Sequence, residues 1–402
     1  MLSAIKESQD YIKLATSLLP VFAKTAVERD KEGGTAKYER DRLRQSGLLK
    51  LVIPERYGRL GETWITTLKI VREFAKVDSS IAHLFGYHHL QVITPHLYGS
   101  LEQKQNYYSW TARNNWFWGN ALNPLDQRLI LTPDGQNFRL NGIKSFCSGA
   151  KDSDMLTVSA LPAGESKPVV VAIPTFSHGI TIHDDWDNIG QRQTDSGSVS
   201  FSNVLVKKFE ILASPEILGS PFAALRIHIS HLVRANILLG IALGAFEQAK
   251  KYTTSETKPW LTSGVESATA DPYILQTYGN LWVNLSAASV LTDQAAEKFQ
   301  IAWERDTKLT ADEFGESAIA ITTATAFATR IGLEVSSQIF EVMGARATAK
   351  EYGFDRYWRN LRTLTLHDPL AYKVREVGKW ALNQEFPLRV SRNGRNEGDE
   401  KN

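Results

Sequence analysis

The stretch RLILTPDGQNFRLNGIKSF, residues 128–146, differs in pattern from the long helical segments on both sides of it. Two apolar runs in it are separated by PDGQN, a cluster of turn-forming residues, and this pattern predicts two strands joined by a turn. Similar runs continue to Val206, and Val199 and Phe201 alternate with serines as in a half-buried strand. We therefore expect residues 116–215 to form a small β barrel or sandwich.

The segments on either side of this β domain carry helical patterns. In residues 1–115 apolar residues recur at helical spacing, which predicts a helical N-terminal domain. In residues 216–390 four long helical patterns with short connections predict an antiparallel four-helix bundle. These patterns cover about residues 222–255, 272–301, 311–343 and 369–386. The polar tail, residues 391–402, is expected to be disordered, so the fold class is α+β with three domains and a tail.

Composition limits the classes of function. With 402 residues, of which 43% are hydrophobic, the chain can bury the core of two or three domains. Its 46 basic and 44 acidic residues give a net charge of +2 and form no long basic tract, so we expect no nucleic-acid partner and no anionic membrane partner. The single cysteine, Cys147, excludes an intramolecular disulfide and cannot form a zinc site by itself.

Nothing in the sequence predicts export or membrane insertion. Residues 1–24 are amphipathic and charged throughout, unlike a secretory signal with its basic head and apolar middle. No segment approaches the roughly 20 apolar residues that are needed to cross a bilayer. We therefore expect a cytoplasmic protein.

A second informative segment, FDRYWRNLRTLTLHDPLAYK, covers residues 354–373 and places His367 and Asp368 directly before Pro369. Proline cannot continue a preceding helix and restricts the residue before it, so we expect a short ordered loop that begins the next helix. A histidine in such a loop can titrate near neutral pH, which makes His367 a catalytic candidate. A helix cap with a surface histidine fits the same residues equally well.

Motifs for metals and phosphate loops are weak or missing in this sequence. His228 and His231 have a spacing that can place two imidazoles side by side, but no carboxylate partner or H-E-x-x-H pattern accompanies them. No G-x-G-x-x-G follows an expected strand, and no G-x-x-x-x-G-K-[ST] occurs. We expect no metal site and no nucleotide fold of these types.

The order of a helical part, a β part and a four-helix bundle resembles the layout of the acyl-CoA dehydrogenase family. In that family a strand with the pattern G-x-K-x-W-I-T-N-G lines the flavin, and GIKSFCSGA, residues 142–150, is similar to it. Phe146 and Ser148 match its aromatic and hydroxyl positions. The resemblance implies an aromatic ring beside the flavin and a hydroxyl that donates toward its reactive edge.

The loop before the last helix departs from the family pattern. Many members carry there the glutamate that removes an α proton from a thioester, and this chain has His367 and Asp368 instead. Asp368 is one methylene shorter than that glutamate. The resemblance therefore does not favour α-proton removal as the chemistry of this chain.

Two segments are similar to one subgroup of the family, the reduced-flavin-dependent monooxygenases exemplified by dibenzothiophene monooxygenase. They are GARATAKEYGFDRYWRNLRTLTLHDPLAYK, residues 344–373, and DWDNIGQRQTDSG, residues 185–197. The H-x-x-x-Y motif of the subgroup matches His83 and Tyr87, whose spacing of four puts both on one helical face. Alone, such a histidine more often packs in a core, and the resemblance reverses this preference.

The resemblance also implies a set of site residues. The catalytic group would be His83, Ser148 and His367, which hydrogen-bond or deliver protons at the reacting oxygen. The cofactor-binding group would be Tyr87, Asn120, Phe146, Ser148, Trp186, Lys258, Arg346 and Asp368. Lys258 stands where the subgroup usually has arginine and keeps the charge but loses the two-pronged contact to a phosphate. Arg346 would reach the cofactor phosphate of a neighbouring subunit.

The function that the resemblance implies is an FMNH2-dependent two-component monooxygenase. A separate flavin reductase would supply reduced FMN, which reacts with dioxygen to form a flavin hydroperoxide and oxygenates a small apolar, organosulfur substrate. Apolar walls would come from Phe85, Leu122 and Trp186, and the protein would be a homotetramer. The alternatives are an FAD-dependent acyl-CoA dehydrogenase and a non-catalytic binding protein on the same scaffold.

Overall fold

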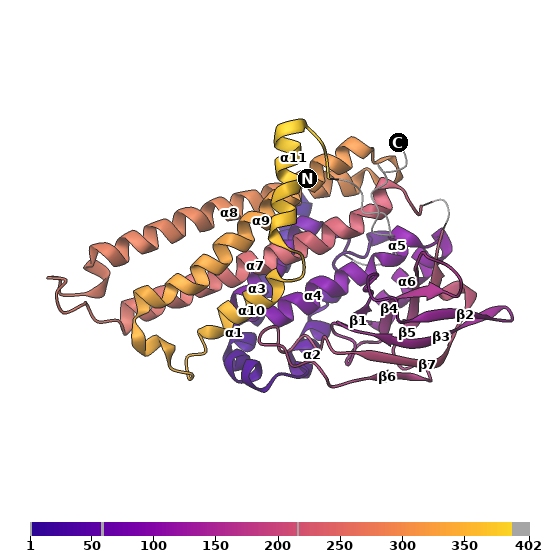
Figure 1. Cartoon of the computed structure of the whole chain (residues 1–402), viewed down its shortest axis with the longest axis horizontal. Helices are drawn as coiled ribbons and strands as arrows, with labels where there is room; N and C mark the ends of the chain where they lie inside the picture. Colours follow the sequence, from indigo (N-terminus) through magenta and orange to yellow (C-terminus); the bar gives the residue numbers. More distant parts are fainter. Residues whose placement is uncertain (1, 58–59, 215–216, 388–402) are drawn as a thin grey trace.

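The computed structural model of the chain describes residues 2–57, 60–214 and 217–387 (Figure 1). Its N-terminal part contains the helices α1 (Leu2–Glu32), α2 (Lys37–Ser46), α3 (Trp64–Val77), α4 (Ser79–Val92), α5 (Thr94–Tyr98) and α6 (Leu101–Asn114). The β domain contains β1 (Trp118–Ala121), β2 (Ile130–Asp134), β3 (Asn137–Lys144), β4 (Met155–Pro162), β5 (Val169–Pro174), β6 (Ile180–Ile182), β7 (Val199–Val206) and β8 (Ile211–Leu212). The C-terminal part contains α7 (Pro221–Ser255), α8 (Pro272–Glu304), α9 (Ala311–Met343), α10 (Asp355–Thr365) and α11 (Leu370–Asn383).

This order of elements confirms the predicted fold class. The sheet lies toward one end of the molecule, and α7, α8 and α9 extend side by side away from it (Figure 1). The expected tail, residues 391–402, lies outside the described residues.

The strands form one mixed sheet with its own hydrophobic core. Their order is β6-β7-β3-β2-β4-β5-β8, with β1 paired to β4. The pairs β1–β4 and β2–β4 are parallel, and the remaining pairs are antiparallel. Cys147 is fully buried in this core, in agreement with a packing role.

Helix α4 lies at the centre of the molecule, where it packs against α3, α7 and β1. It begins after Asp78, whose carboxylate accepts a hydrogen bond from the Ile81 N–H at 3.0 Å and so caps the helix. All of its residues are buried. Its polar side chains must therefore find partners inside the protein, because an unpaired buried polar group costs about 1–3 kcal/mol.

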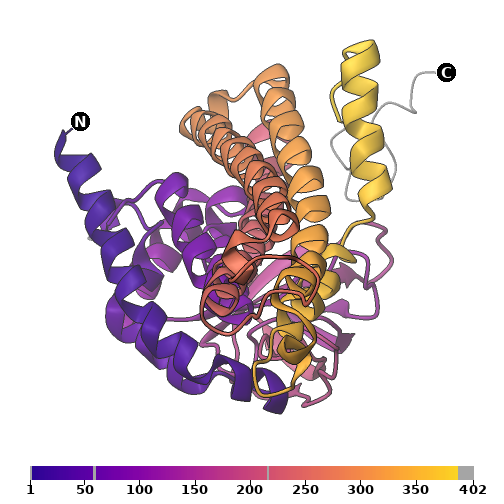
Figure 2. The same cartoon turned by 90° about the vertical axis from the view of Figure 1, so that its left-hand side faces the viewer.

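The C-terminal helices differ in two respects from the predicted bundle. Helix α10 was not predicted, because most of its residues are polar and its apolar face is narrow. That face is formed by Tyr357, Leu361 and Leu364. Helix α11 packs on α9 and otherwise stands apart from the long helices (Figure 2). In the place that was predicted for the fourth helix of the bundle, α3 of the N-terminal part packs on α7 and α8.

The expectation that no segment is apolar enough to cross a bilayer was wrong for two helices. Over the described residues, α7 and α9 are long and apolar enough by length and composition, with mean hydropathies of 1.6 and 1.2 in their most apolar windows. However, 83% and 67% of those windows are buried inside the fold. Their apolar character follows from their position in the core.

A close approach between α3 and α7 requires glycine at position 244. A Cβ atom on Gly244 would lie 2.0 Å from the Lys76 carbonyl oxygen. We predict that Gly244→Ala lowers the free energy of unfolding by about 1–3 kcal/mol through overpacking. Gly279→Ala is the matched control, because a Cβ atom there meets nothing within 4 Å, and removing a helical glycine should leave stability unchanged or raise it by up to about 1 kcal/mol. Thermal unfolding of both variants checks this, and a Gly244→Ala protein that melts with the wild type would contradict it.

Candidate active site

His83 and Tyr87 form the part of the site that α4 contributes. Their rings stack with centroids 4.3 Å apart and an angle of 7° between the planes, which confirms that they share one helical face. The His83 Nε2 atom lies 3.2 Å from the Ser148 hydroxyl of the β domain. The Tyr87 hydroxyl lies 3.3 Å from the Ser230 hydroxyl on α7. This face of α4 thus lies where the β domain and the C-terminal helices meet.

His83 is a neutral imidazole with one free nitrogen. Burial, together with the nearby charges of His367 and Arg234, lowers its pKa to about 3. The Nδ1 atom is buried and has no hydrogen-bond partner among the described residues. An imidazole in this state can hydrogen-bond a bound ligand without an electrostatic cost at neutral pH.

Phe146 and Ser148 lie in the turn that follows β3. The Ser148 N–H donates to the Phe146 carbonyl at 3.1 Å, and this tight turn places Phe146 in the left-handed region with φ of 59°. The Phe146 side chain is 59% exposed, and its ring meets Trp186 edge to face at 6.0 Å. The resemblance implied that both residues continue the strand, but β3 ends at Lys144, and the turn that follows exposes the Phe146 ring and leaves the Ser148 side chain buried.

Asn120 lies beside this turn and is held from both its backbone and its side chain. Its N–H donates to the Ser148 carbonyl at 3.0 Å. Its Oδ1 atom accepts from Gln91 at 3.2 Å and from the Leu122 N–H at 3.1 Å. The side-chain Oε1 atom of Gln91 in turn accepts from Arg226 at 2.9 Å, so α4 and α7 orient the amide of Asn120.

His367 and Asp368 lie in the loop between α10 and α11, and Arg234 of α7 holds both. An Arg234 nitrogen lies 2.8 Å from His367 Nδ1, and the other terminal nitrogen donates to the Asp368 carboxylate at 2.5 Å. His231 and Lys373 approach the same carboxylate at 3.3 and 3.4 Å. Pro369 is the N-cap residue of α11, which begins at Leu370, so the loop leads directly into the next helix as the sequence predicted.

The carboxylate of Asp368 stays ionised. Burial alone would raise its pKa, but the hydrogen bonds of His231 and His367 and the charges of Arg234 and Lys373 outweigh burial and hold the pKa well below its usual range. A general base works best with a pKa near the operating pH, so Asp368 is a poor proton acceptor.

Lys258 and Arg346 do not join this group of residues. Both are exposed, and the hydrogen bond from the Thr257 hydroxyl to the Met343 carbonyl, 3.1 Å long, ties their two segments together at the end of the long helices. The part of α7 between Arg234 and Ser255 spans about 30 Å at 1.5 Å per residue. One subunit therefore does not bring Arg346 and His83 to the same flavin.

Phe85 does not line the site, so this part of the prediction was wrong. Its ring packs edge to face between Phe74 and His89, at 5.2 and 4.6 Å, and it is fully buried in the core. A residue two positions after His83 points to the opposite side of a helix. Arg234 was missed, although a lone cation in the apolar run HLVRANILLG is a signal that the charge is buried for a purpose.

His228 and His231 do not form a metal site. His228 stacks on Phe314 at 4.2 Å, and His231 engages Asp368. Over the residues that the structure describes, no group of three or more histidine, cysteine, aspartate or glutamate side chains is arranged to hold a metal ion.

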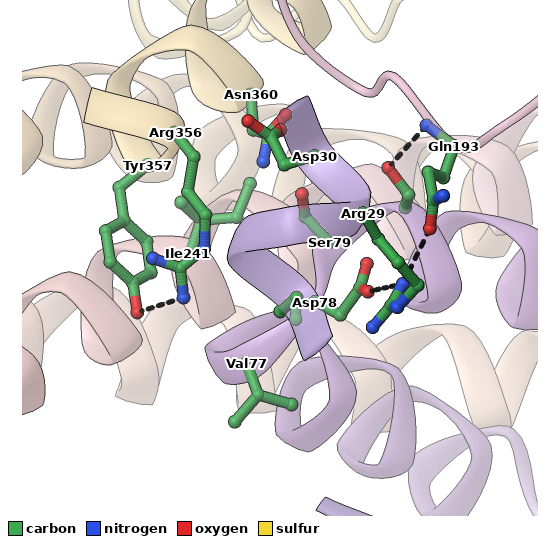
Figure 3. A pocket seen from close by; sticks show the side chains of 13 residues that line it. Arg29, Asp30, Val77, Asp78, Ser79, Gln193, Ile241, Arg356, Tyr357 and Asn360 are labelled. Atoms are coloured by element: carbon green, nitrogen blue, oxygen red, sulfur yellow. Dashed lines mark hydrogen bonds and ion pairs between the residues drawn. The ribbon is translucent and has the colours of Figure 1, made fainter. Parts of the chain in front are cut away.

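A small polar cavity lies behind the site, between α1, α4 and α10. It has a volume of about 20 Å³, which is room for about one water molecule. Figure 3 shows that Arg29 bonds both Asp78 and Gln193 beside it, at 2.5 and 2.7 Å. The ion pair with Asp78 joins α1 to the start of α4, and the hydrogen bond to Gln193 joins α1 to the β domain, so the cavity is structural.

Comparison with known proteins gives three consecutive family matches. Models described as the N-terminal, middle and C-terminal domains of acyl-CoA dehydrogenase match residues 16–115, 120–204 and 232–371. A probable FMNH2-dependent monooxygenase, SfnC of Pseudomonas putida, is 51% identical over 378 residues, which cover 94% of this chain and 95% of that protein.

Two solved structures are similar to this chain over nearly its whole length. Methanesulfinate monooxygenase MsuC from Pseudomonas fluorescens is 52% identical with a TM-score of 0.93, and the match covers 95% of this chain and 99% of that chain. The FMN-bound form of TdsC, a dibenzothiophene monooxygenase from Paenibacillus sp. A11-2, is 41% identical with a TM-score of 0.90, again over 95% and 99%.

The neutral state of His83 predicts a pH dependence of stability. The pKa is about 3 in the folded protein against an ordinary value of 6.5. Below pH 6.5 the His83 imidazole of the unfolded chain binds a proton, whereas the imidazole in the folded protein does not. The free energy of unfolding is therefore unaffected by this group above pH 6.5 and decreases as the pH falls from 6.5 toward 3. Between these two pKa values, one histidine that is held neutral lowers the free energy of unfolding by about 1.4 kcal/mol for each unit by which the pH falls.

We predict that His83→Gln loses less stability than the wild type when the pH is lowered from about 7.5 to about 5.5. Chemical unfolding at the two pH values measures the difference. His183→Gln, which replaces an exposed histidine, is the matched control. Equal losses of stability in His83→Gln and the wild type would show that His83 is not held neutral.

Proposed function

We propose that this chain, which belongs to the acyl-CoA dehydrogenase family and is an FMNH2-dependent monooxygenase, oxygenates a small organosulfur compound at its sulfur atom. The relatives support the substrate class, because their names refer to methanesulfinate and dibenzothiophene. They also support a flavin reductase and dioxygen as partners, because a monooxygenase named for its dependence on FMNH2 needs a source of reduced flavin.

The observation that carries this function is the state of Asp368. An acyl-CoA dehydrogenase needs a carboxylate that takes a proton from its substrate, and Asp368 is ionised and held by Arg234 and His231 with a lowered pKa. The neutral His83, with a bare nitrogen in the same region, suits hydrogen bonding to oxygen or flavin instead. This favours the monooxygenase over the FAD-dependent alternative.

The residues present fit a flavin ring. The Nδ1 atom of His83 is buried without a partner among the described residues, and Phe146, two residues before the Ser148 that contacts His83, exposes an apolar ring. We propose that Phe146, Trp186 and Tyr87 contact the flavin ring and that Asn120 fixes its orientation. When bound, reduced FMN supplies the electrons that activate dioxygen.

Three side chains act on the reacting oxygen in this proposal. His83 and Ser148 form hydrogen bonds there, and His367, which Arg234 orients at 2.8 Å, delivers a proton from the other side. The buried surroundings of α4 exclude water, so that reduced oxygen is not released as hydrogen peroxide.

Lys258 and Arg346 would bind the FMN phosphate of a neighbouring subunit. Both carry a positive charge at the exposed end of the long helices, far from His83 of their own chain. A homotetramer, as the resemblance to the family implied, would place them at another subunit's site and would make assembly a condition of activity. A cytoplasmic location, where a reductase can supply reduced FMN, completes the proposal.

The test of this function compares two cofactor regimes in the purified protein. The monooxygenase should turn over a sulfinate or an aromatic sulfide only with FMN, a flavin reductase and a reduced nicotinamide. Tightly bound FAD that is bleached by an acyl thioester, without any reductase, would refute the proposal in favour of the dehydrogenase.

His83→Ala and His367→Ala should each lower product formation by about 100-fold, because each removes a group that hydrogen-bonds or protonates the reacting oxygen. Reduced FMN should still consume dioxygen, and hydrogen peroxide should replace the product. The ratio of peroxide to product measures this uncoupling. His183→Ala serves as the exposed control, and variants at His83 and His367 that stay coupled would remove both residues from the catalytic group.

Mixing two impaired variants tests the shared site. His83→Ala lacks the catalytic histidine, and Arg346→Ala lacks the proposed phosphate ligand, so neither should be active alone. If the two residues serve one flavin from different subunits, a random equal mixture of the co-refolded or co-expressed variants contains intact sites. About one quarter of all sites then combine an intact His83 with an intact Arg346, and activity should return in that proportion. Activity that is only the sum of the two variants would place both residues on the same subunit's cofactor or remove Arg346 from the site.

A further inference from the structure

A chain of hydroxyl groups leads away from His83 into the segment that follows Trp186. The Ser148 hydroxyl lies 2.7 Å from the Ser196 hydroxyl, which lies 2.7 Å from the Thr194 hydroxyl. The Thr194 hydroxyl donates to the carbonyl oxygen of Gln191 at 2.9 Å. All three hydroxyls belong to buried residues, so each hydrogen bond is made inside the protein.

The carbonyl at the end of this chain fixes the direction of every hydrogen bond in it. A carbonyl oxygen only accepts, so the single hydroxyl proton of Thr194 points to Gln191. Ser196 must then donate to Thr194, and Ser148 must donate to Ser196. Because the hydroxyl proton of Ser148 points to Ser196, the Ser148 oxygen can only accept from His83. The Nε2 atom of His83, 3.2 Å from this oxygen, must therefore be the donor.

This direction determines the tautomer of His83. A neutral imidazole carries one proton, and here that proton lies on Nε2. The Nδ1 atom is then a bare acceptor, and it is the buried nitrogen without a partner among the described residues. This acceptor is therefore available to a ligand.

The hydroxyls of Ser148, Ser196 and Thr194 hold one fixed arrangement of hydrogen bonds and do not conduct protons. We call this arrangement the lock. A proton that moved from His83 along the hydroxyls would arrive at the Gln191 carbonyl, which does not take up a proton at neutral pH. The hydroxyls can therefore hold one arrangement of hydrogen bonds but cannot carry a proton to solvent.

The position of the Gln191 carbonyl is itself fixed by several contacts. It also accepts from the Trp186 indole N–H at 2.8 Å, and the Gln191 N–H donates to the Asn360 side chain at 2.6 Å. The Gln191 side chain donates to Ser79 at the start of α4 at 2.9 Å. A Cβ atom at Gly190 would lie 2.2 Å from the Arg359 carbonyl, so only glycine permits this approach to α10.

We propose that Thr194 and Ser196 are positioning residues that hold His83, through Ser148, in the tautomer with its proton on Nε2. His83 then offers the site an acceptor that takes an N–H or O–H group from a ligand. Given the proposed function, this ligand is the flavin, whose reduced ring carries an N–H where the oxidised ring has a bare nitrogen. The lock therefore favours binding of reduced over oxidised FMN.

Nitrogen-15 NMR of protein with labelled histidines, without flavin, tests the lock directly. The His83 signals are identified by their loss in His83→Gln. In the wild type Nδ1 should be unprotonated and Nε2 protonated. Thr194→Val removes the donor to Gln191 and frees Ser196 to point the other way, so the Nδ1-protonated tautomer should appear. Thr194→Ser, which keeps the hydroxyl, should retain the wild-type signals.

A wild-type His83 protonated on Nδ1 would overturn the lock even if no variant folds. An unchanged tautomer in folded Thr194→Val would overturn the role of Thr194.

The second measurement is the ratio of dissociation constants for oxidised and reduced FMN. We expect the preference for reduced FMN to fall by up to about tenfold in Thr194→Val, the worth of one hydrogen bond, and to stay unchanged in Thr194→Ser. A switched tautomer with an unchanged ratio would show that the lock exists but does not act on flavin. A failure of the proposed function, with no binding of reduced FMN in any variant, is thus distinct from a failure of the lock.

Discussion

The burial of His83 as a neutral imidazole on α4 is the constraint on which the site depends. Every residue of α4 is buried, so a charged histidine there would lose its hydration without a carboxylate partner to repay it. One ring nitrogen is satisfied by Ser148, and the other is left for a ligand. The surrounding elements serve this arrangement, since α7 and the β domain close over the helix and the hydroxyls of the β domain fix its hydrogen bonds.

Asp368 in the loop before α11 is kept charged, in contrast to His83. Asp368 is kept ionised by Arg234, His231 and Lys373, whereas His83 is kept neutral. A site with a neutral imidazole and a tightly paired carboxylate lacks a strong base but can hydrogen-bond and protonate reduced oxygen. Members of one fold family can thus differ in chemistry through the residues of one loop, because the scaffold positions a flavin in either case.

Local patterns in the sequence predicted the parts of the fold and site that depend on local spacing. The spacing of four between His83 and Tyr87 follows from helix geometry. The left-handed turn at Phe146 was not predicted, because the sequence motif suggested a continuous strand there. The contacts of Arg234 with His367 and of Ser196 with Ser148 join segments far apart in the chain, so local patterns do not reveal these partners. The lone cation in the apolar run of α7 signals only that Arg234 is buried for a purpose. Phe85 was assigned to the wrong side of α4, and α10 was missed because its apolar stripe is narrow.

The central claim is that this buried site couples the oxidation of reduced FMN to the transfer of one oxygen atom from dioxygen. Turnover under isotopically labelled dioxygen, with mass spectrometry of the sulfur product, measures that transfer most directly. The account predicts one labelled oxygen atom in each product molecule, with the second atom in water. A product whose new oxygen comes from solvent, or no oxygenated product while reduced FMN is consumed, would contradict it.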